Sequence, residues 1–310
     1  MSDIVIGIDG GGTTTRVMVA NEAGTEVATV EGPGSAIRPG EADRSADVMA
    51  TTVREALAAC EMTHVTPRVL CVGVAGAGRE PEREALWQAL VARELATDVL
   101  VHTDAMIGLD DAFGEGAGLL LIAGTGSVGY GRGPTGAFAR CGGWGPTCGD
   151  EGSGHWIGRR ALSIVTAAHD GREPETALTG AVLTATELNE VADLIPWAAG
   201  ATPATIATLA PVVLAVAQAG DLRANSLVTM AVEELVLHTR TLARQLFIDE
   251  RASVPLALGG GLLSRGSLLR KRLVNRLKVA VPGAVVREES VVPVRGAVRA
   301  ALRLLGNPAA

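Results

Sequence analysis

A strand, a glycine turn and a second strand at the start of the chain constrain its fold more than any other feature. An apolar run at residues 4–8 leads into three successive glycines at 10–12, and a second apolar run follows at 17–19. This order predicts a hairpin. Glycines leave the turn without Cβ atoms, so its backbone amides can approach an anion closely. An ordinary glycine hairpin has the same pattern, so this segment alone does not choose between the two.

The same pattern returns about a hundred residues later, at residues 119–131. In each copy the next turn glycine, Gly24 or Gly136, lies eleven residues after a turn threonine, Thr13 or Thr125. Equal internal spacing predicts a duplicated phosphate-binding unit rather than two unrelated hairpins.

Charge and composition exclude several classes of protein. The net charge of −7 argues against a nucleic-acid surface. Lys271 and Lys278 are the only lysines, which excludes a Walker A loop. The longest apolar stretch, 205–219, contains Pro211 and is too short to span a bilayer. With no basic N-terminal segment and four scattered cysteines, we expect a cytoplasmic protein without a disulfide framework.

Apolar periodicity predicts strands that alternate with helices, which is typical of an α/β fold. The first half is predicted to hold a helix at 42–60, strands at 69–74 and 98–102, and a helix beginning at Pro81. The second half is predicted to hold a loop at 141–154, helices near 155–168, 221–247, 265–277 and 294–305, and strands at 254–258 and 284–287. The repeat suggests domains at 1–115 and 116–310, with the closing helix free to pack back on the first.

A third glycine turn, 259–261, follows the predicted strand 254–258. Three such turns resemble the actin-like superfamily of sugar kinases and heat-shock ATPases. The block C-G-G-W-G-P-T-C-G-D-E-G-S at 141–153 is more specific, together with the segments 9–13, 103–104, 124–127, 220–224 and 293–297. With these the chain resembles the N-acetylglucosamine and glucosamine kinase branch of the BadF/BadG/BcrA/BcrD ATPase family. The resemblance implies an actin-like, ribonuclease H-like fold, in which two similar α/β domains flank an active-site cleft.

ATP and Mg²⁺ are the expected cofactors. The two hairpins would hold the β- and γ-phosphates, with the hydroxyls of residues 13–15 as donors, and the third turn would support the adenosine. The expected ATP-binding residues are Gly11, Gly12, Thr13, Thr14, Thr125, Gly126, Gly260, Gly261 and Ser264. Asp9, at the end of the first strand, could bind Mg²⁺ through water.

Asp104 is the expected catalytic base. It follows the predicted strand 98–102, and ligands of α/β proteins collect at the carboxyl ends of strands. There it could orient a sugar 6-hydroxyl and accept its proton. Local sequence equally allows Asp104 to cap the next helix. Its correspondence to the catalytic aspartate of the similar kinases favours the base.

The resemblance also implies an amino-sugar site. Its expected residues are Ser35, Asp104, Gly142, Gly143, Trp144 and Asp150. Structural roles stay open as alternatives to sugar binding. Trp144 could be a core residue in a tight turn, and Asp150 or Glu151 could stabilise the dipole of the following helix. Ser35 and Val128 stand where similar kinases often carry asparagine. Cys141 and Cys148 are spaced too widely for a common zinc pair, so no metal beyond Mg²⁺ is expected.

The predicted function is therefore ATP-dependent phosphorylation of an amino sugar at its 6-hydroxyl. N-acetylglucosamine, glucosamine and a muramic derivative all remain open as acceptors. Two other classes compete: the activator ATPase of a 2-hydroxyacyl-CoA dehydratase system, and an actin-like ATPase without a sugar substrate. The expected partners are small molecules rather than nucleic acid or membrane, and the resemblance alone suggests a homodimer.

Overall fold

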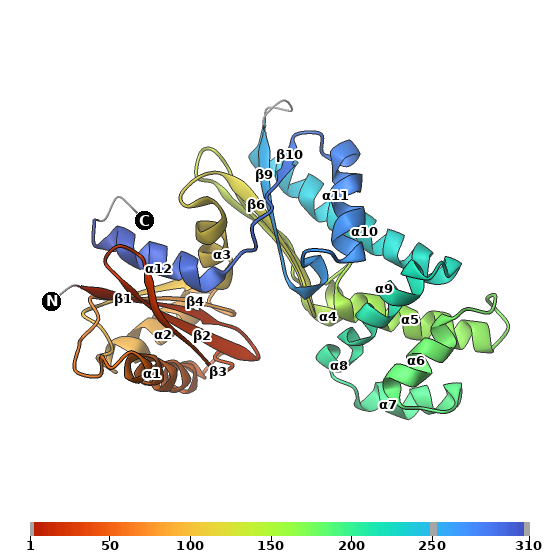
Figure 1. Ribbon diagram of the computed structural model, residues 1–310, viewed down its shortest axis with the longest axis horizontal. Helices are drawn as coiled ribbons and strands as arrows, with labels where there is room; N and C mark the ends of the chain where they lie inside the picture. The colour runs from red at the N-terminus through yellow and green to blue at the C-terminus, as the bar shows by residue number, and fades with distance from the viewer. Residues whose placement is uncertain (1–2, 249–252, 307–310) are drawn as a thin grey trace. The chain divides into compact units, whose positions relative to one another are not determined.

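A computed structural model describes residues 3–248 and 253–306 (Figure 1). Contacts divide the chain into two compact units. Unit 1 comprises the described residues up to Gly116 and those from Val291, and unit 2 comprises 117–290. The ends of the expected domains, 1–2 and 307–310, and residues 249–252 lie outside the described part.

Unit 1 is a sheet covered by helices on both faces. Its elements are β1 (Ile4–Gly10), β2 (Thr14–Asn21), β3 (Glu26–Pro33), α1 (Ala42–Ala59), β4 (Val69–Val74), α2 (Glu80–Val91), β5 (Asp98–Thr103), α3 (Asp104–Phe113) and α12 (Pro293–Leu304). The strand order is β3-β2-β1-β4-β5, with β1, β4 and β5 parallel. Figure 1 shows α1 and α2 on one side of this sheet, and α3 and α12 on the other.

Strand alternation explains both layers of unit 1. Ile6 and Ile8 of β1 face the core built with α1 and α2, whereas Val5, directly before Ile6, faces α12. A Cβ on Gly7 would stand 2.6 Å from the Val294 carbonyl oxygen. The glycine therefore allows α12 to lie directly on β1.

Two carboxylates of α3 bind α12 to unit 1. Asp111 accepts a hydrogen bond from the Val292 amide at 2.7 Å and pairs with Arg295 at 3.0 Å. Asp110 pairs with Arg303. Both aspartates are buried and depend on these cations, and Asp111 has a second one, Arg299, at 3.8 Å.

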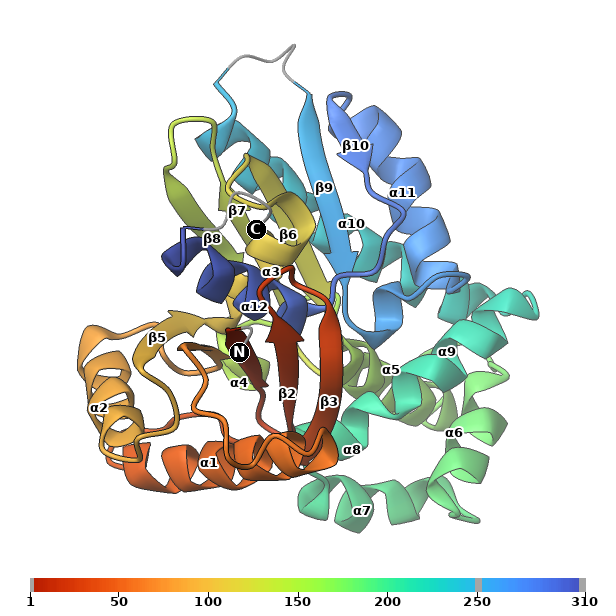
Figure 2. The same ribbon diagram turned by 60° about the vertical axis from the view of Figure 1, so that its left-hand side comes forward.

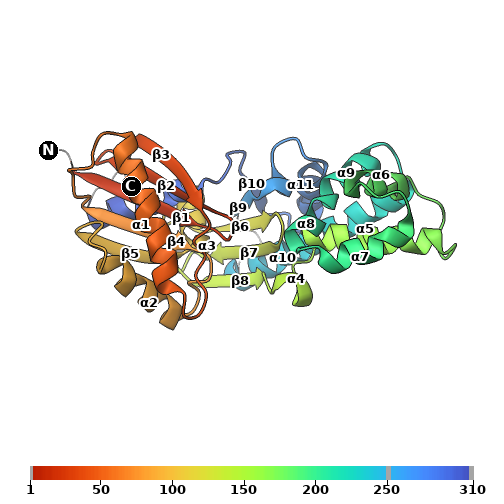
Figure 3. The same ribbon diagram turned by 90° about the horizontal axis from the view of Figure 1, so that it is seen from below.

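Unit 2 repeats the sheet of unit 1 and adds a group of helices. Its elements are β6 (Gly118–Ala123), β7 (Ser127–Arg132), β8 (Phe138–Gly142), α4 (Gly145–Cys148), α5 (Gly154–His169), α6 (Leu178–Thr186), α7 (Leu194–Gly200), α8 (Pro203–Ala207), α9 (Leu209–Gln218), α10 (Leu222–Leu246), β9 (Val254–Gly259), α11 (Leu268–Ala280) and β10 (Ala284–Val286), with 3-10 turns at Val191–Asp193 and Gly261–Leu263. Figure 3 shows β6, β7 and β8 running side by side toward α5–α9.

The two sheets share one topology. Strand order β8-β7-β6-β9-β10 matches β3-β2-β1-β4-β5 strand for strand, with an antiparallel meander followed by two parallel strands. Figure 2 gives a second view of both sheets. The predicted α/β class with two similar halves is confirmed.

Two local predictions were wrong. The segment predicted as a loop at 141–154 contains the helical turn α4, which begins beside Pro146. The helix predicted at 265–277 begins at Leu268, because the Ser267 hydroxyl accepts a hydrogen bond from the Arg270 amide and caps it.

Within the described residues no single helix is long and apolar enough to cross a bilayer, and one bent pair, Pro203–Gln218 with Leu222–Leu246, meets the length and composition test at an angle of 119°.

Candidate active site

The first glycine turn joins β1 to β2 and has an exposed rim. The Gly11 amide donates to the Thr14 carbonyl oxygen at 3.0 Å and closes the turn. Gly12, Thr13 and Thr14 are exposed, and a Cβ on Gly12 would meet no atom within 4 Å. The rim therefore presents open backbone and two hydroxyls, which suits a phosphate group.

Ser35 supports this turn from inside. Its amide and that of Ala36 both donate to the Gly11 carbonyl oxygen at 3.0 Å. Ser35 is 1% exposed, and its hydroxyl oxygen lies within hydrogen-bond distance, 2.7 Å, of the Thr15 hydroxyl oxygen. The expectation that Thr15 donates to phosphate was wrong, because strand alternation turns this side chain into the core. A sugar-binding role for Ser35 stays a prediction.

Asp9 lies near the end of β1, paired across the sheet with Gly73 of β4 and Arg16 of β2. Burial and the negative charge of Asp104 raise the pKa of Asp9 to about 6, and Arg16 opposes them. Arg16 also pairs with Glu31, with its Nε 3.0 Å from the carboxylate. The Asp9 carboxylate is therefore incompletely neutralised, which fits a divalent cation held through water.

Asp104 begins α3 directly after β5. Burial raises the pKa of its carboxyl group, and the Ala105 amide, which donates to Oδ1 at 2.9 Å, lowers it in part. The helix cap is Thr103, whose hydroxyl accepts from the Met106 amide at 3.2 Å. The capping role that competed with the catalytic role thus belongs to Thr103. A partly buried carboxylate with a raised pKa is suited to accept a proton.

A glycine lets α3 bring Asp104 close to the sheet. A Cβ on Gly73 of β4 would stand 2.2 Å from the Ile107 side chain of α3. Gly73 lies beside Asp9 in the sheet. The close packing of α3 on Gly73 therefore keeps the carboxylates of Asp9 and Asp104 together at the carboxyl ends of the strands. Asp9, Asp104 and the first glycine turn are therefore neighbours within unit 1.

The second glycine turn, between β6 and β7, is held by the first turn of α5. The Gly154 amide donates to the Gly124 carbonyl oxygen at 2.7 Å, and the His155 amide donates to that of Thr125 at 3.1 Å. Its last paired residues, Ala123 and Ser127, enclose three turn residues, whereas the first hairpin encloses four. The Thr125 side chain is exposed, like those on the rim of the first turn.

Asp150 connects this turn to the tryptophan loop. Burial raises the pKa of its carboxyl group, while hydrogen bonds from the Ser127 and Gly145 amides lower it. A Cβ on Gly126 would stand 2.7 Å from Asp150 Oδ2. The N-cap of α5 is Ser153, whose hydroxyl accepts from the Trp156 amide at 3.2 Å. Asp150 therefore does not cap α5, and its contact with a sugar stays a prediction.

The tryptophan loop is glycine-rich for steric reasons. Gly142 and Gly143 have φ angles of +76° and +70°, and a Cβ on Gly142 would stand 2.2 Å from His238 Nε2. Trp144 is 68% exposed, and the Arg140 guanidinium lies 4.7 Å from its ring centroid. The alternative of a core tryptophan is wrong, and the exposed ring offers an apolar face to a ligand.

Both cysteines of this loop are free thiols. Burial raises the pKa of Cys141, with Thr241 as its hydrogen-bond partner, and Cys148 is exposed. In the part of the chain that the structure describes, no group of three or more His, Cys, Asp or Glu side chains could hold a metal ion.

The third glycine turn lies beside the second. β9 is parallel to β6, so both turns follow the carboxyl ends of neighbouring strands. Gly260 has φ of +85°, and a Cβ there would stand 2.3 Å from the Ala123 carbonyl oxygen. Gly261 has open space around it, and the Ser264 amide donates to its carbonyl oxygen at 3.4 Å. Unit 2 thus groups Gly126, Asp150 and the third turn around the end of β6.

Sequence reasoning missed the residues that hold these turns in place. Thr15 and Ser127 occupy matching positions after the two turns, and both side chains are buried. The Thr15 hydroxyl donates to the Pro33 carbonyl oxygen at 2.5 Å. The Ser127 hydroxyl donates to the Glu151 carbonyl oxygen at 2.7 Å. A hydroxyl residue directly after each turn was visible in the repeat. Its partner was not, because the partner lies far along the chain.

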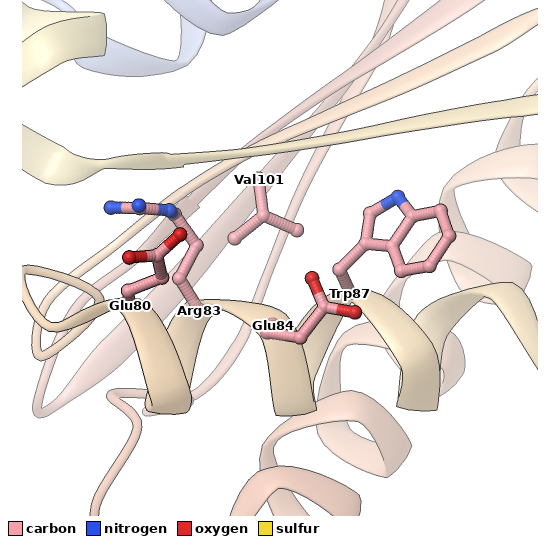
Figure 4. Close-up of a pocket in the computed structure, with 5 residues that line it drawn as sticks. All are labelled: Glu80, Arg83, Glu84, Trp87 and Val101. Carbon is pink, nitrogen blue, oxygen red and sulfur yellow. The ribbon is translucent and has the colours of Figure 1, made fainter.

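A surface pocket of about 440 Å³ lies elsewhere on unit 1, between α2 and β5. It is lined by Glu80, Arg83, Glu84, Trp87 and Val101 (Figure 4). Two carboxylates against one guanidinium do not favour a phosphate, and none of the predicted site residues lines it.

Residues 6–303 match the model of the BadF/BadG/BcrA/BcrD ATPase family. The chain belongs to this family. It is 30% identical to an N-acetyl-D-glucosamine kinase from Dictyostelium discoideum, over 97% of this chain and 98% of that protein. It is 31% identical to an N-acetylmuramic acid/N-acetylglucosamine kinase from Clostridium acetobutylicum, over 90% and 91%.

The architecture agrees with the family. The solved structure of a candidate N-acetylglucosamine kinase from Chromobacterium violaceum superposes with a TM-score of 0.79 at 30% identity, over 96% of this chain and 98% of that one. The two matching sheets are those of the actin-like fold. The predicted family and fold are confirmed.

Proposed function

We propose that this member of the BadF/BadG/BcrA/BcrD family is an ATP-dependent kinase that transfers the γ-phosphate to the 6-hydroxyl of N-acetylglucosamine or glucosamine. One observation carries the proposal: a partly buried carboxylate with a raised pKa, Asp104, follows the end of β5 beside Asp9 and the first glycine turn. The names of the two relatives, both kinases of N-acetylated amino sugars, support the acceptor class.

In this proposal the oxygen of the sugar 6-hydroxyl attacks the γ-phosphorus and ADP leaves. Asp104 accepts the proton of that hydroxyl as the attack proceeds. The two hairpin turns position the β- and γ-phosphates through Gly11, Gly12, Thr13, Thr14, Thr125 and Gly126. Gly260, Gly261 and Ser264 support the nucleoside. A Mg²⁺ ion, when bound, neutralises charge on the phosphates, and Asp9 would hold it through water.

The sugar would contact the tryptophan loop of unit 2. Trp144 is exposed and offers an apolar face to the sugar. The glycines before it let the backbone approach the sugar ring closely. Asp150 already accepts two amide hydrogen bonds, and its remaining lone pairs can accept from sugar hydroxyls. Ser35 would act chiefly by keeping the first turn in place.

An ADP-release assay across acceptor sugars tests the function. We expect N-acetylglucosamine or glucosamine to raise turnover well above background hydrolysis, and N-acetylmannosamine, muramic derivatives and glucose to rank below. Hydrolysis that no sugar stimulates would favour an actin-like ATPase without a sugar substrate. Iron in the anaerobically purified protein would favour the dehydratase activator.

A cytoplasmic homodimer is part of the same proposal and rests on the family resemblance. Light scattering after gel filtration should give twice the chain mass of 31.7 kDa. A monomer would remove the dimer from the proposal and leave the reaction untouched.

A further inference from the structure

A groove on unit 2 lies between α5 and α10, which pack against each other. It has a volume of about 500 Å³, within the range of small-molecule sites. Its lining residues are Arg159, Arg160, Ser163, Ile164, Ala167, Glu173, Arg223, Ser226, Leu227 and Met230. None of them belongs to the candidate active site. We refer to it as the α5–α10 groove.

The helix periodicity places these residues on facing stripes. Arg160, Ser163, Ile164 and Ala167 follow helical i, i+3, i+4, i+7 spacing along α5. Residues 223, 226, 227 and 230 repeat that spacing along α10. The groove is therefore about 10 Å long, from seven residues at 1.5 Å each. Its floor is apolar and its ends are charged.

The groove carries an excess of positive charge on a chain whose net charge is −7. Three arginines face one carboxylate, Glu173, which pairs with Arg223. Among residues 3–248 and 253–306, Arg159 and Arg160 have no carboxylate partner. The Arg160 guanidinium lies 4.2 Å from the ring centroid of Trp156, which fixes its plane and orients its N–H donors. This end of the groove suits a doubly charged anion.

The remaining lining residues suit a hydroxylated body. The Ser163 hydroxyl donates to the Arg159 carbonyl oxygen at 3.2 Å, and the Ser226 hydroxyl donates to that of Leu222 at 2.9 Å. Because these hydrogens are used, the serine oxygens can accept hydrogen bonds from a ligand. Leu227 is buried in the floor and offers apolar contact. The volume is also larger than an inorganic anion needs.

We propose that the α5–α10 groove binds a phosphate monoester of a small hydroxylated molecule, such as a sugar phosphate, with the phosphate on Arg159 and Arg160. The site is separate from the proposed catalytic site. It shares α5 with the second glycine turn, which the first amides of that helix hold. Binding is measured without turnover, and the test rests on the proposed function only for the ligands that fill the catalytic site.

Isothermal titration tests the proposal on the full-length protein. The catalytic site is first saturated with Mg²⁺, the non-hydrolysable ATP analogue AMPPNP and N-acetylglucosamine. N-acetylglucosamine 6-phosphate is then titrated, with inorganic phosphate as a separate probe. We expect one ester per chain, with binding that weakens as salt is added. Inorganic phosphate should bind more weakly, because it has no organic body to contact the apolar floor of the groove.

Three variants identify the site. Arg159→Ala with Arg160→Ala should weaken ester binding by about tenfold or more, because charge-assisted hydrogen bonds are lost. Arg240→Ala with Arg244→Ala removes the same charge from α10 outside the groove, and should leave affinity within about twofold. Glu173→Gln removes the only carboxylate of the groove and should tighten binding about twofold. A destabilised protein would not show that gain.

Three results would overturn the proposal. The first is no ester binding once the catalytic site is filled. The second is unchanged affinity in the double variant Arg159→Ala, Arg160→Ala. The third is inorganic phosphate that binds as tightly as the ester, which would reduce the groove to a general anion site.

Discussion

The carboxylates of Asp9 and Asp104 act on each other within unit 1: the negative charge of Asp104, added to burial, raises the pKa of Asp9 to about 6. The two residues come from β1 and from the start of α3, with β4 between their strands. Two adjacent, partly buried carboxylates beside an open glycine turn are the elements that phosphoryl transfer requires.

Asp104→Asn should lower kcat by about 10²- to 10⁴-fold, because asparagine cannot accept the proton of the sugar hydroxyl. Sugar affinity should change little, since the amide keeps the size of the carboxyl group. Steady-state ADP release and calorimetric sugar binding measure the two effects. Asp98→Asn, at the exposed start of the strand β5 that precedes Asp104, controls for loss of charge. Near-normal turnover in Asp104→Asn would remove Asp104 as the base.

Gly126→Ala should destabilise unit 2 by about 1–3 kcal/mol, because the new Cβ displaces a buried carboxylate from its amide donors. That Cβ would stand 2.7 Å from Asp150 Oδ2. Gly124→Ala in the same turn is the control, since a Cβ there meets no atom within 4 Å. Urea unfolding measures both. Equal losses in the two variants would mean that the contact with Asp150 is not the cause.

Gly296→Ala should destabilise unit 1 by roughly 3 kcal/mol, because overpacking between α12 and α3 has no flexible side chain to absorb it. The Cβ would stand 1.8 Å from the Ile107 carbonyl oxygen, which is backbone. Gly180→Ala, in α6 with open space around it, should instead stabilise by about 0.5–1 kcal/mol. Thermal unfolding measures whether each variant is less or more stable than the wild type. A neutral Gly296→Ala would contradict the close helix packing.

Asp221→Ala should reduce stability by about 1 kcal/mol at neutral pH, because the carboxylate caps α10. Burial alone would raise the pKa of Asp221, but hydrogen bonds from the Ala224 and Ala177 amides and from Thr176 lower it below 3.8. The folded protein thus favours the charged form. This stability is present above the unfolded-state pKa and is lost as pH falls through the lower folded value.

Unfolding curves of Asp221→Ala from neutral pH to pH 3 measure this dependence. Asp193→Ala is the matched control, since Asp193 precedes α7 without a side-chain capping bond. The difference between wild type and Asp221→Ala should shrink on acidification. A difference that stays constant down to pH 3 would contradict the shifted pKa.

Local sequence predicted most elements, because short-range chemistry decides them. Apolar runs on either side of the glycine turns predicted both hairpins, and helical spacing placed α1 within one residue. The start of α11 was missed, because several residues near Arg265 could begin a helix and the Ser267 hydroxyl made the capping bond.

The site residues divide in the same way. The open rim of the first turn follows from glycine and threonine chemistry, which the sequence shows directly. Which of Thr103 and Asp104 caps α3 depends on a single hydrogen bond to the Met106 amide. Whether Asp150 faces solvent or backbone amides depends on where β7 and α4 lie.

The sequence by itself determined the α/β class, the duplicated glycine turns and the family, because strand periodicity and turn chemistry are local. Only the tertiary structure decided that Asp104 is a partly buried neighbour of Asp9, that the Ser35 hydroxyl faces Thr15, and that α12 packs on β1. Burial, charge coupling and hydrogen-bond satisfaction depend on residues brought together from distant parts of the chain, and a linear pattern does not contain those contacts.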